Sequence, residues 1–497
     1  MYNIFGNARQ QRRVLRDSGA SARIEGRENK ERELQEKDLA RAFNPRTVAV
    51  VGVSTTNMFH PANIIYNKNF YGYDCEVFAV NPKGGEIDKR PVYRSLAEVP
   101  EKVEMAVVAV KARLVPDVAR DCADAGVETM VVISGGFAEM GPEGRELQDR
   151  LVEICEKASI TLIGPNCFGV YAPPVVDTFF LPPERTVLPA MGRTAVASQS
   201  GAFLVDQIMT SFHEVGLGLS VAVSMGNKAM VNEEDLLLHF AARDDTDTLC
   251  FYIEGIDEGV RRFIESARQV TPDKPIVVYS GGKSERGKSA AKSHTAALAA
   301  DHELIEGALK QSGILEAETE SEVTSFCKIL SFYRRPLHLC NVAIISSSGG
   351  HGVVAADLAD TAGINIPQFS SMRRKELLSL LDPTIRDIAS VSNPVDLTGS
   401  ASDLDFERTL EYLLSQDDIE AALVLTLPYT PMMTSFVGTR LGQVVKRHDK
   451  PVVAYVPNLA KYQMVLEGFE LNGIPVVHGI SEGIEMFKAL KLVGDSC

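Results

Sequence analysis

The sequence contains no tryptophan, and aromatic residues make up only 7% of its 497 residues. The buried cores must therefore be built mainly from aliphatic side chains. No apolar run reaches the roughly 18–20 residues that a membrane-spanning helix needs, and no secretory signal pattern is present. These absences predict a cytoplasmic chain with no membrane partner.

Positive charge is also scarce. The chain has 51 Lys and Arg residues against 66 Asp and Glu residues, which gives a formal net charge of −15. Nucleic acids and anionic membranes bind basic surfaces, so neither is expected as a partner. The eight cysteines include no CxxC pair and mostly lie in apolar runs, which predicts reduced, buried thiols and no metal site.

The N-terminal segment, residues 1–37, differs in composition from the rest of the chain. Its first 16 residues carry four arginines and no acid, a pattern found in organelle transit peptides, but many acidic residues follow. This charge pattern favours a polar extension, with a role in subunit contacts, over a transit peptide.

Beyond residue 37, short apolar runs alternate with helix-like segments. The run TVAVVGV begins at Thr47, and comparable runs recur along the whole chain. Strands that are apolar on both faces and alternate with helices predict parallel sheets covered on both sides. At about 150 residues per domain, this α/β pattern predicts three successive domains, at residues 38–180, 190–335 and 338–497.

The turn after the first apolar run is a candidate ligand site, because parallel sheets bind ligands at the carboxyl ends of their strands. Gly52 is followed by Ser54 and Thr55. The other glycines of a GxGxxG fingerprint are missing, so NAD binding is disfavoured. The turn predicts either a phosphate or nucleotide site or a simple helix cap.

Two later turns of the first domain are richer in glycine. Lys83 precedes two glycines in NPKGG, a combination that suits a diphosphate. Ser134, Gly135 and Gly136 form the other turn, where glycines allow a ligand close to the backbone.

The second domain offers an anion site and a candidate carboxylate. In the SQSGA stretch, Ser198 closes a strand, and Ser200 and Gly201 open a helix whose free N–H groups attract anions. The apolar run DTLCFYIE ends in Glu254. By position alone this glutamate either faces the site or lies on the surface.

The segment from Gly282 to Ser289 matches the Walker A pattern GxxxxGK[ST] and follows a strand. A P-loop NTPase is therefore an alternative function. Three features oppose it. The segment follows the last strand of its domain, no hydrophobic run ending in Asp supplies a Walker B partner, and a second polar turn is expected next in place of an immediate helix.

His294 lies in the stretch KSHTAAL, which follows this segment. A lone histidine is usually structural, and a helix cap is the ordinary interpretation. Here Lys283, Arg286, Lys288 and Lys292 make the preceding segment cationic, and small residues flank the imidazole. A cationic loop with an accessible imidazole suits a phosphohistidine, because positive groups compensate the dianion.

The order of these motifs along the chain resembles that in the NDP-forming acyl-CoA synthetases, the superfamily of succinyl-CoA synthetase. The resemblance is strongest to the α subunits of ADP-forming acetyl-CoA synthetases. It runs from about residue 38 to the C-terminus. The motifs are VGVS, NPKGG, ISGGF, IGPNCFG, SQSGA, FYIEG, KSHTAAL and NPVDLTG.

The resemblance implies a Rossmann-like CoA-binding domain, a flavodoxin-like domain with a phosphohistidine loop, and a second flavodoxin-like (ligase-CoA) domain. It places His294 as the phosphorylated residue, Glu254 as the carboxylate that orients it, and Asn166 at the border of the reaction centre. Ser198, Ser200 and Gly201 would hold the phosphate. The implied CoA contacts are Gly52, Ser54, Thr55, Lys83, Ser134, Gly135 and Gly136.

The implied reaction is acyl-CoA + phosphate + ADP giving acid + CoA + ATP. This sequence departs from the family pattern at two points. The ATP-grasp domain of the family is missing, so a β subunit supplies ATP/ADP and Mg²⁺ sites in a hetero-oligomer such as α2β2, or the chain lacks ATP chemistry. His351 also stands where relatives often have a smaller residue or proline. A non-catalytic CoA- or acyl-CoA-binding regulatory module is the main alternative, and the sequence leaves the acid undefined.

Overall fold

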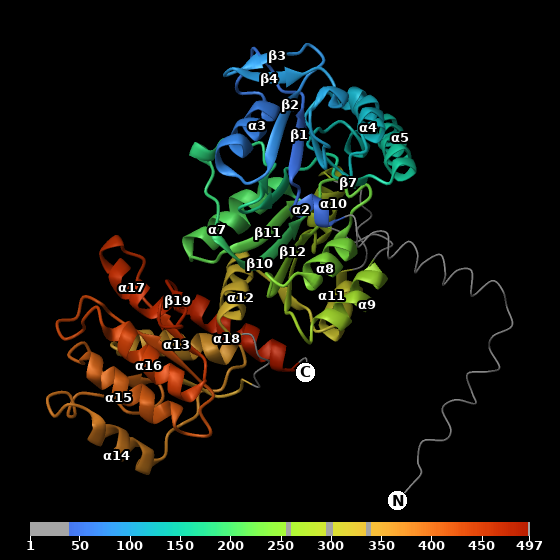
Figure 1. The fold of residues 1–497 in the computed structure, drawn as a ribbon. Coiled ribbons are helices and arrows are strands. Elements are labelled where there is room, and N and C mark those ends of the chain that lie inside the picture. The colour runs from blue at the N-terminus through green and yellow to red at the C-terminus, as the bar shows by residue number, and fades with distance from the viewer. Residues whose placement is uncertain (1–38, 255–259, 295–301, 334–338, 496–497) are drawn as a thin grey trace, which may run out of the picture.

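The computed structural model describes residues 39–495 except 255–259, 295–301 and 334–338. Three sheets follow one another along the chain, and each is flanked by helices (Figure 1). The α/β fold class with three parallel-dominated sheets is thereby confirmed. Within the described ranges, no helix is both long and apolar enough to cross a membrane.

The first sheet has the order β3-β4-β2-β1-β5-β6-β7, and every neighbouring pair is parallel except β3–β4. Side chains alternate between its faces, so Val48 and Val50 pack under helix α3, whereas Ala49 and Val51 face α4 and α5. The elements are α3 (Pro61–Gly72), α4 (Val115–Asp124), α5 (Pro142–Ala158), β1 (Thr47–Val51), β2 (Glu76–Val80), β3 (Gly85–Ile87), β4 (Arg90–Tyr93), β5 (Met105–Val108), β6 (Thr129–Val132) and β7 (Thr161–Ile163).

The second sheet has the order β14-β13-β12-β10-β11-β8-β9. Its parallel part, from β14 to β11, has the flavodoxin-like order with β10 at the switch point. β8 and β9 extend it as antiparallel strands. The strands are β8 (Gly169–Ala172), β9 (Val176–Asp177), β10 (Met191–Ser198), β11 (Leu219–Ser224), β12 (Thr248–Ile253), β13 (Ile276–Ser280) and β14 (Leu315–Ala317).

The sheet pairing crosses the boundary that the sequence predicts near residue 180. β8 and β9 fall inside the predicted first domain, yet they hydrogen-bond to the second sheet. One continuous apolar core also runs from Val48 and Val50 beneath α3 to Val221 and Val223 of β11. The first two domains are therefore packed through a shared core.

The third sheet is entirely parallel, with the order β16-β15-β17-β18-β19. Helices α12 (Glu320–Phe332) and α18 (Ile480–Asp495) join it to the second sheet (Figure 1). Lys328 of α12 donates to the Glu470 carboxylate and the Val476 carbonyl, each at 2.7 Å. The strands are β15 (Val342–Ser346), β16 (Val395–Asp396), β17 (Ala421–Leu425), β18 (Val452–Tyr455) and β19 (Val476–Val477).

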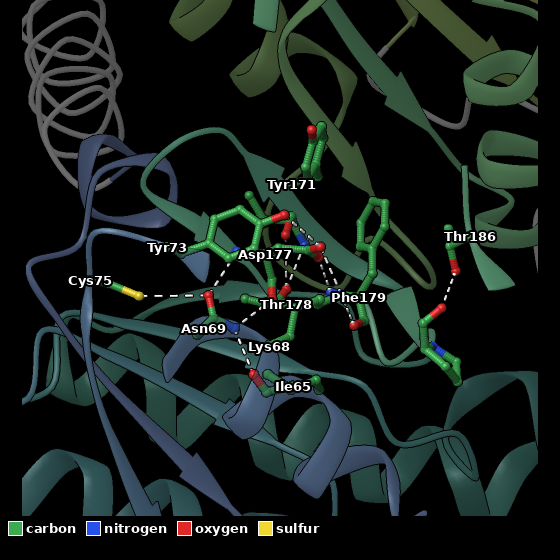
Figure 2. Close-up of polar contacts among 12 residues, drawn as sticks. Ile65, Lys68, Asn69, Tyr73, Cys75, Tyr171, Asp177, Thr178, Phe179 and Thr186 are labelled. Atoms are coloured by element: carbon green, nitrogen blue, oxygen red, sulfur yellow. Dashed lines mark hydrogen bonds and ion pairs between the residues drawn. The ribbon is translucent and has the colours of Figure 1, made fainter. Parts of the chain in front are cut away.

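A buried ion pair fixes α3 of the first domain against β9 of the second sheet. Lys68 lies 2.7 Å from Asp177, whose side chain is fully buried. Figure 2 shows Lys68, Asn69 and Tyr73 converging on this carboxylate and its backbone. Burial raises the pKa of Asp177 and lowers that of Lys68, because both charges have left water. Each charge therefore depends on the other for compensation.

Removing the positive charge of Lys68 should show how strongly the buried Asp177 depends on it. Lys68→Met leaves the Asp177 carboxylate buried without its cation, so we expect a loss of about 3–5 kcal/mol in the free energy of unfolding. Urea denaturation measures it. Lys157→Met, which breaks the exposed pair with Glu153 on α5, is the matched control and should cost less than about 0.5 kcal/mol. Equal losses from both variants would contradict the assignment.

Candidate active site

The turn after β1 is shaped by Gly52. Its φ is +110°, and a Cβ added here would lie 2.6 Å from the carbonyl oxygen of Ala109, which follows β5. The Gly52 N–H donates to Val80 of β2 at 2.9 Å. Gly52 thus brings the ends of β1, β2 and β5 together, and its lack of a side chain leaves the backbone open to a ligand.

Asparagines hold the polar turns beside Gly52. Ser54 accepts through Oγ from the N–H groups of Thr56 and Asn57, at 3.2 and 3.0 Å. Asn63 of α3 exchanges two hydrogen bonds with the Ser54 backbone, at 2.7 and 2.8 Å. Asn81 donates to the Val53 carbonyl at 2.9 Å, which ties the β2 turn to the β1 turn.

The predicted lysine turn therefore lies beside the predicted serine–threonine turn. The Lys83 N–H donates to Asn81 Oδ1 at 3.0 Å, and the Lys83 side chain is exposed. A Cβ at Gly85 would lie 3.0 Å from the Thr55 methyl group. The structure thus brings Gly52, Ser54, Thr55 and Lys83 to one edge of the first sheet.

The third predicted turn follows β6 and is anchored by a residue that the sequence analysis missed. Ser134 donates through Oγ to the Val110 carbonyl at 2.5 Å. The Gly136 and Phe137 N–H groups both donate to Glu139 Oε1, at 2.5 and 3.1 Å. Burial would raise the pKa of Glu139, but hydrogen bonds from Asn227 and from these amides outweigh burial and lower the pKa. Glu139 therefore stays ionised.

The loop that carries Asn166 meets a loop of the second domain. The Asn227 N–H donates to the Pro165 carbonyl at 2.9 Å, and the Ala229 N–H donates to Gly164 at 3.1 Å. Gly226 has a φ of +56°, and a Cβ there would lie 2.4 Å from the Pro165 oxygen. Only glycine permits this approach, so the two domains meet backbone to backbone at Asn166.

Asn166 itself connects this junction to the first sheet. Its N–H donates to the Ser134 carbonyl at 3.0 Å, and its Oδ1 lies 3.0 Å from the position of a Cβ on Gly135. Its side chain is exposed. Asn166 is thus placed between the Ser134–Gly136 turn and the second domain.

The SQSGA turn opens a helix, as predicted. The Ser200 Oγ accepts from the Phe203 N–H at 3.3 Å and caps α6 (Gly201–Phe203), which continues through η6 (Leu204–Met209) into α7 (Thr210–Glu214). Ser198 donates to the Ser200 carbonyl at 2.7 Å. The helix N-terminus is thereby fixed at the carboxyl end of β10, where its dipole favours an anion.

Phe168 links this helix to the Asn166 loop. A Cβ at Gly201 would lie 2.2 Å from a ring carbon of Phe168, and the Phe168 N–H donates to Ser224 Oγ at 3.1 Å. The phenyl ring thus lies against the first residue of the helix. The SQSGA turn and the Asn166 loop are therefore in direct contact.

Glu254 is tied to the same turn. Its N–H donates to Gln199 Oε1, and the Gln199 N–H donates to the Tyr252 carbonyl at 3.1 Å. The Tyr252 ring stacks on Phe203, with centroids 4.1 Å apart. Burial and the hydrogen bond to the Glu254 carboxylate raise the pKa of Tyr252. The structure thus places Glu254 beside Ser198, Ser200 and Gly201.

His294 is the last described residue of helix α10 (Glu285–His294). The placement of its side chain lies outside the described residues, as do residues 295–301. The polar turn expected at residues 289–295 is wrong up to His294, because the chain is helical there. Helix α10 already begins at Glu285, inside the Walker-like segment, so its backbone does not form the open cradle of a P-loop. Lys283 is paired with Glu316 at 2.8 Å.

Several residues of this site were missed by sequence reasoning, and their positions show how they could have been found. Asn227 follows β11 in the same way that the predicted residues follow their strands. Gln199 lies inside the predicted SQSGA turn. The contacts of Glu139 with Asn227 and of Phe168 with Ser224 span 88 and 56 residues, so no local pattern indicates them. Among the described residues, no group of three or more His, Cys, Asp or Glu side chains could hold a metal ion.

Two domain families define the class of this protein. Residues 46–173 match the CoA binding domain family, and residues 191–330 match the succinyl-CoA ligase like flavodoxin domain family. The chain thus combines a domain of the CoA-binding family with a succinyl-CoA ligase-like flavodoxin domain, as the sequence motifs predict.

Relatives that are similar over most of their length show which protein family the chain belongs to. The chain is 36% identical over 464 residues to the subunit alpha of acetate–CoA ligase [ADP-forming] I from Pyrococcus furiosus, which covers 91% of this chain and 97% of that subunit. The chain belongs to the family of ADP-forming acetate–CoA ligases. It is 38% identical to acetate–CoA ligase [ADP-forming] I from Archaeoglobus fulgidus over 79% of its length, but spans only 56% of that longer protein.

A solved structure agrees with this family. The dinucleotide-forming acetyl-coenzyme A synthetase 1 of Ca. Korarchaeum cryptofilum, in complex with phosphate and ADP, matches with a TM-score of 0.81 and 30% identity. The match covers 92% of this chain and 97% of that chain.

The contact between Gly201 and Phe168 makes a stability prediction. Gly201→Ala places a methyl group into the Phe168 ring, so we expect a loss of about 1–3 kcal/mol in the free energy of unfolding. Gly307→Ala is the control, because it lies in α11 (His302–Gln311) with nothing within 4 Å of the added Cβ. It should be neutral or stabilise by up to about 1 kcal/mol.

A double-mutant cycle on urea unfolding completes this test. Phe168→Ala makes room for the methyl group, so Gly201→Ala should cost little when Phe168→Ala is already present. Additive effects of the two substitutions would show that the ring does not press on the helix start.

Proposed function

We propose that this chain is the α subunit of an ADP-forming acid–CoA ligase. It would interconvert acyl-CoA, phosphate and ADP with carboxylic acid, CoA and ATP. The observation that carries the proposal is the junction at Asn166, where the carboxyl edge of the first sheet lies beside the helix that begins at the SQSGA turn. A thioester and a phosphate bound at these two edges would be neighbours.

The first sheet would bind CoA at its carboxyl edge. The open backbone at Gly52 and the glycines of the Ser134–Gly136 turn would accommodate the pantetheine and diphosphate, and the exposed Lys83 would pair with a phosphate. The glycine cradle at Gly52 fits this ligand, because a side chain there would fill the space beside Ala109. The CoA sulfur would then point toward Asn166.

The chemistry would proceed by two transfers. A phosphate oxygen attacks the thioester carbonyl, the C–S bond breaks, and CoA leaves as the thiol, which gives an acyl phosphate. The His294 imidazole then attacks phosphorus, the P–O bond to the acyl group breaks, and the carboxylate is released. Dividing the reaction lets each step be positioned separately.

Residues of the second domain would hold the phosphoryl group. The N–H groups at Ser200 and Gly201 and the helix dipole stabilise its negative charge. Glu254 would accept a hydrogen bond from the imidazole and so orient His294. This arrangement requires His294, at the end of α10, to reach the SQSGA turn.

Nucleotide chemistry would come from a partner. We infer a β subunit with an ATP-grasp domain that binds ADP and Mg²⁺, in an assembly such as α2β2 in the cytoplasm. The described residues of this chain offer no three-ligand metal cluster, so no step through Mg²⁺ is assigned to it. The naming of the Pyrococcus relative as a subunit alpha supports this division.

Labelling of His294 tests the proposal. With the partner subunit and [γ-³²P]ATP, we expect one acid-labile phosphoryl group per chain, and the same label from acetyl-CoA with ³²P-phosphate. His294→Asn should abolish both labels, because the asparagine amide has no nucleophilic ring nitrogen to accept the phosphoryl group. His213→Asn, at an exposed histidine of α7, is the matched control and should be labelled like the wild type.

The other outcomes separate the alternatives. Label that persists in His294→Asn contradicts the phosphohistidine. CoA binding without label from either donor would indicate a non-catalytic CoA-binding module instead.

A further inference from the structure

Four polar side chains form one connected network beneath Asn166. Asn227 Nδ2 donates to Glu139 Oε2 at 2.6 Å and to Gln148 Oε1 at 3.0 Å. Asn227 Oδ1 accepts from Asn166 Nδ2 at 3.3 Å. Glu139 and Gln148 belong to the first domain and Asn227 to the second, so the network crosses the junction between the domains.

The ionised state of Glu139 fixes the direction of every bond in this network. A carboxylate only accepts hydrogen bonds, so the side chain of Asn227 must turn its Nδ2 toward Glu139. Its Oδ1 then faces the opposite way and can only accept, which obliges Asn166 to present its own Nδ2. The charge of Glu139 therefore orients the amide of Asn166 through the side chain of Asn227, which lies between them.

This orientation decides what Asn166 offers to a ligand. Its Oδ1 faces the Gly135 turn, and one of its Nδ2 protons is used by Asn227. No further hydrogen bond to this Nδ2 is made by the described residues, and the side chain is exposed. The second Nδ2 proton is thus available to donate to an acceptor oxygen of a ligand.

We propose that Glu139 and Asn227 are positioning residues for the acyl-transfer half of the reaction, acting by fixing the amide of Asn166 so that it donates to an oxygen of the reacting acyl group. This inference rests on the proposed function, and it adds two residues and a direction of hydrogen bonding to it. Phosphoryl transfer between His294 and the nucleotide would use the partner's nucleotide site and no acyl group, so it should not depend on this network.

Glu139→Gln tests the direction of these hydrogen bonds, because glutamine has nearly the same shape as glutamate but carries an amide nitrogen that donates. The carbonyl oxygen of the new glutamine can still accept from Gly136 and Phe137, but its amide nitrogen now faces Asn227 Nδ2. Asn227 must turn over, and Asn166 loses its acceptor. We expect the rate of His294 labelling from acetyl-CoA and ³²P-phosphate to fall about 10- to 100-fold. Labelling from [γ-³²P]ATP should stay within about twofold of the wild type, because it bypasses Asn166.

The double variant Glu139→Gln with Asn227→Asp should restore the hydrogen bond that Asn166 Nδ2 donates to residue 227. The carboxylate introduced at position 227 can accept from the new glutamine, from Gln148 after its amide turns, and from Asn166. Net charge is also unchanged from the wild type. We therefore expect acetyl-CoA-dependent labelling to recover to within about fivefold of the wild type, whereas Asn227→Asp alone, which faces two carboxylates toward each other, should remain impaired.

The same variants give a readout that does not require activity. In a double-mutant cycle on urea unfolding, each single substitution should destabilise the protein and the double variant should recover part of the loss. Additive effects would overturn the network. Equal loss of both labels in Glu139→Gln, no loss of acetyl-CoA-dependent labelling, or no rescue by the double variant would overturn the positioning role.

Failure of the proposed function has a different signature. A wild-type protein that takes no label from either donor, while the unfolding cycle still shows coupling, would contradict the acid–CoA ligase and with it the role in acyl transfer. The network would then be an interdomain contact only.

Discussion

The contact that the candidate site depends on is the backbone junction between the Gly164–Asn166 loop and the Gly226–Ala229 loop. Two hydrogen bonds, from Asn227 to Pro165 and from Ala229 to Gly164, hold it together. Each loop follows a strand of a different sheet, so this junction determines that the carboxyl edges of the two sheets face each other. The predicted CoA turns and the predicted phosphate helix would otherwise belong to separate ligand sites.

Other contacts make this junction rigid from both sides. Lys68 and Asp177 pair in the shared core, so α3 is fixed to the second sheet at a distance from the site. Near the site, Gly226 and Gly201 are places where a side chain would meet neighbouring atoms at 2.4 and 2.2 Å. The site therefore combines a tightly specified interdomain contact with turns that are open to ligands, as pre-organised binding requires.

Sequence patterns predicted the parts of this structure that local periodicity encodes. Strands with two apolar faces indicated three parallel-dominated sheets. The rule that ligands bind after such strands predicted candidate ligand sites at Gly52, Lys83, Ser134 and Ser200. The pairing of β8 and β9 with the second sheet was not predictable, because pairing of short strands depends on tertiary partners. Glu139 and Asn227 are 88 residues apart, and no periodic pattern connects them. The helical course of residues 285–294 was also missed, since a Gly-, Ser- and Lys-rich sequence resembles a loop.

The most direct test of the central claim is a crystal structure of the chain with its partner subunit, CoA and phosphate. We expect phosphate at the N–H groups of Ser200 and Gly201, and the CoA thiol on the same side of the junction, near Asn166 and Gly135. CoA bound along another edge of the first sheet, with its thiol directed away from the phosphate, would contradict the account.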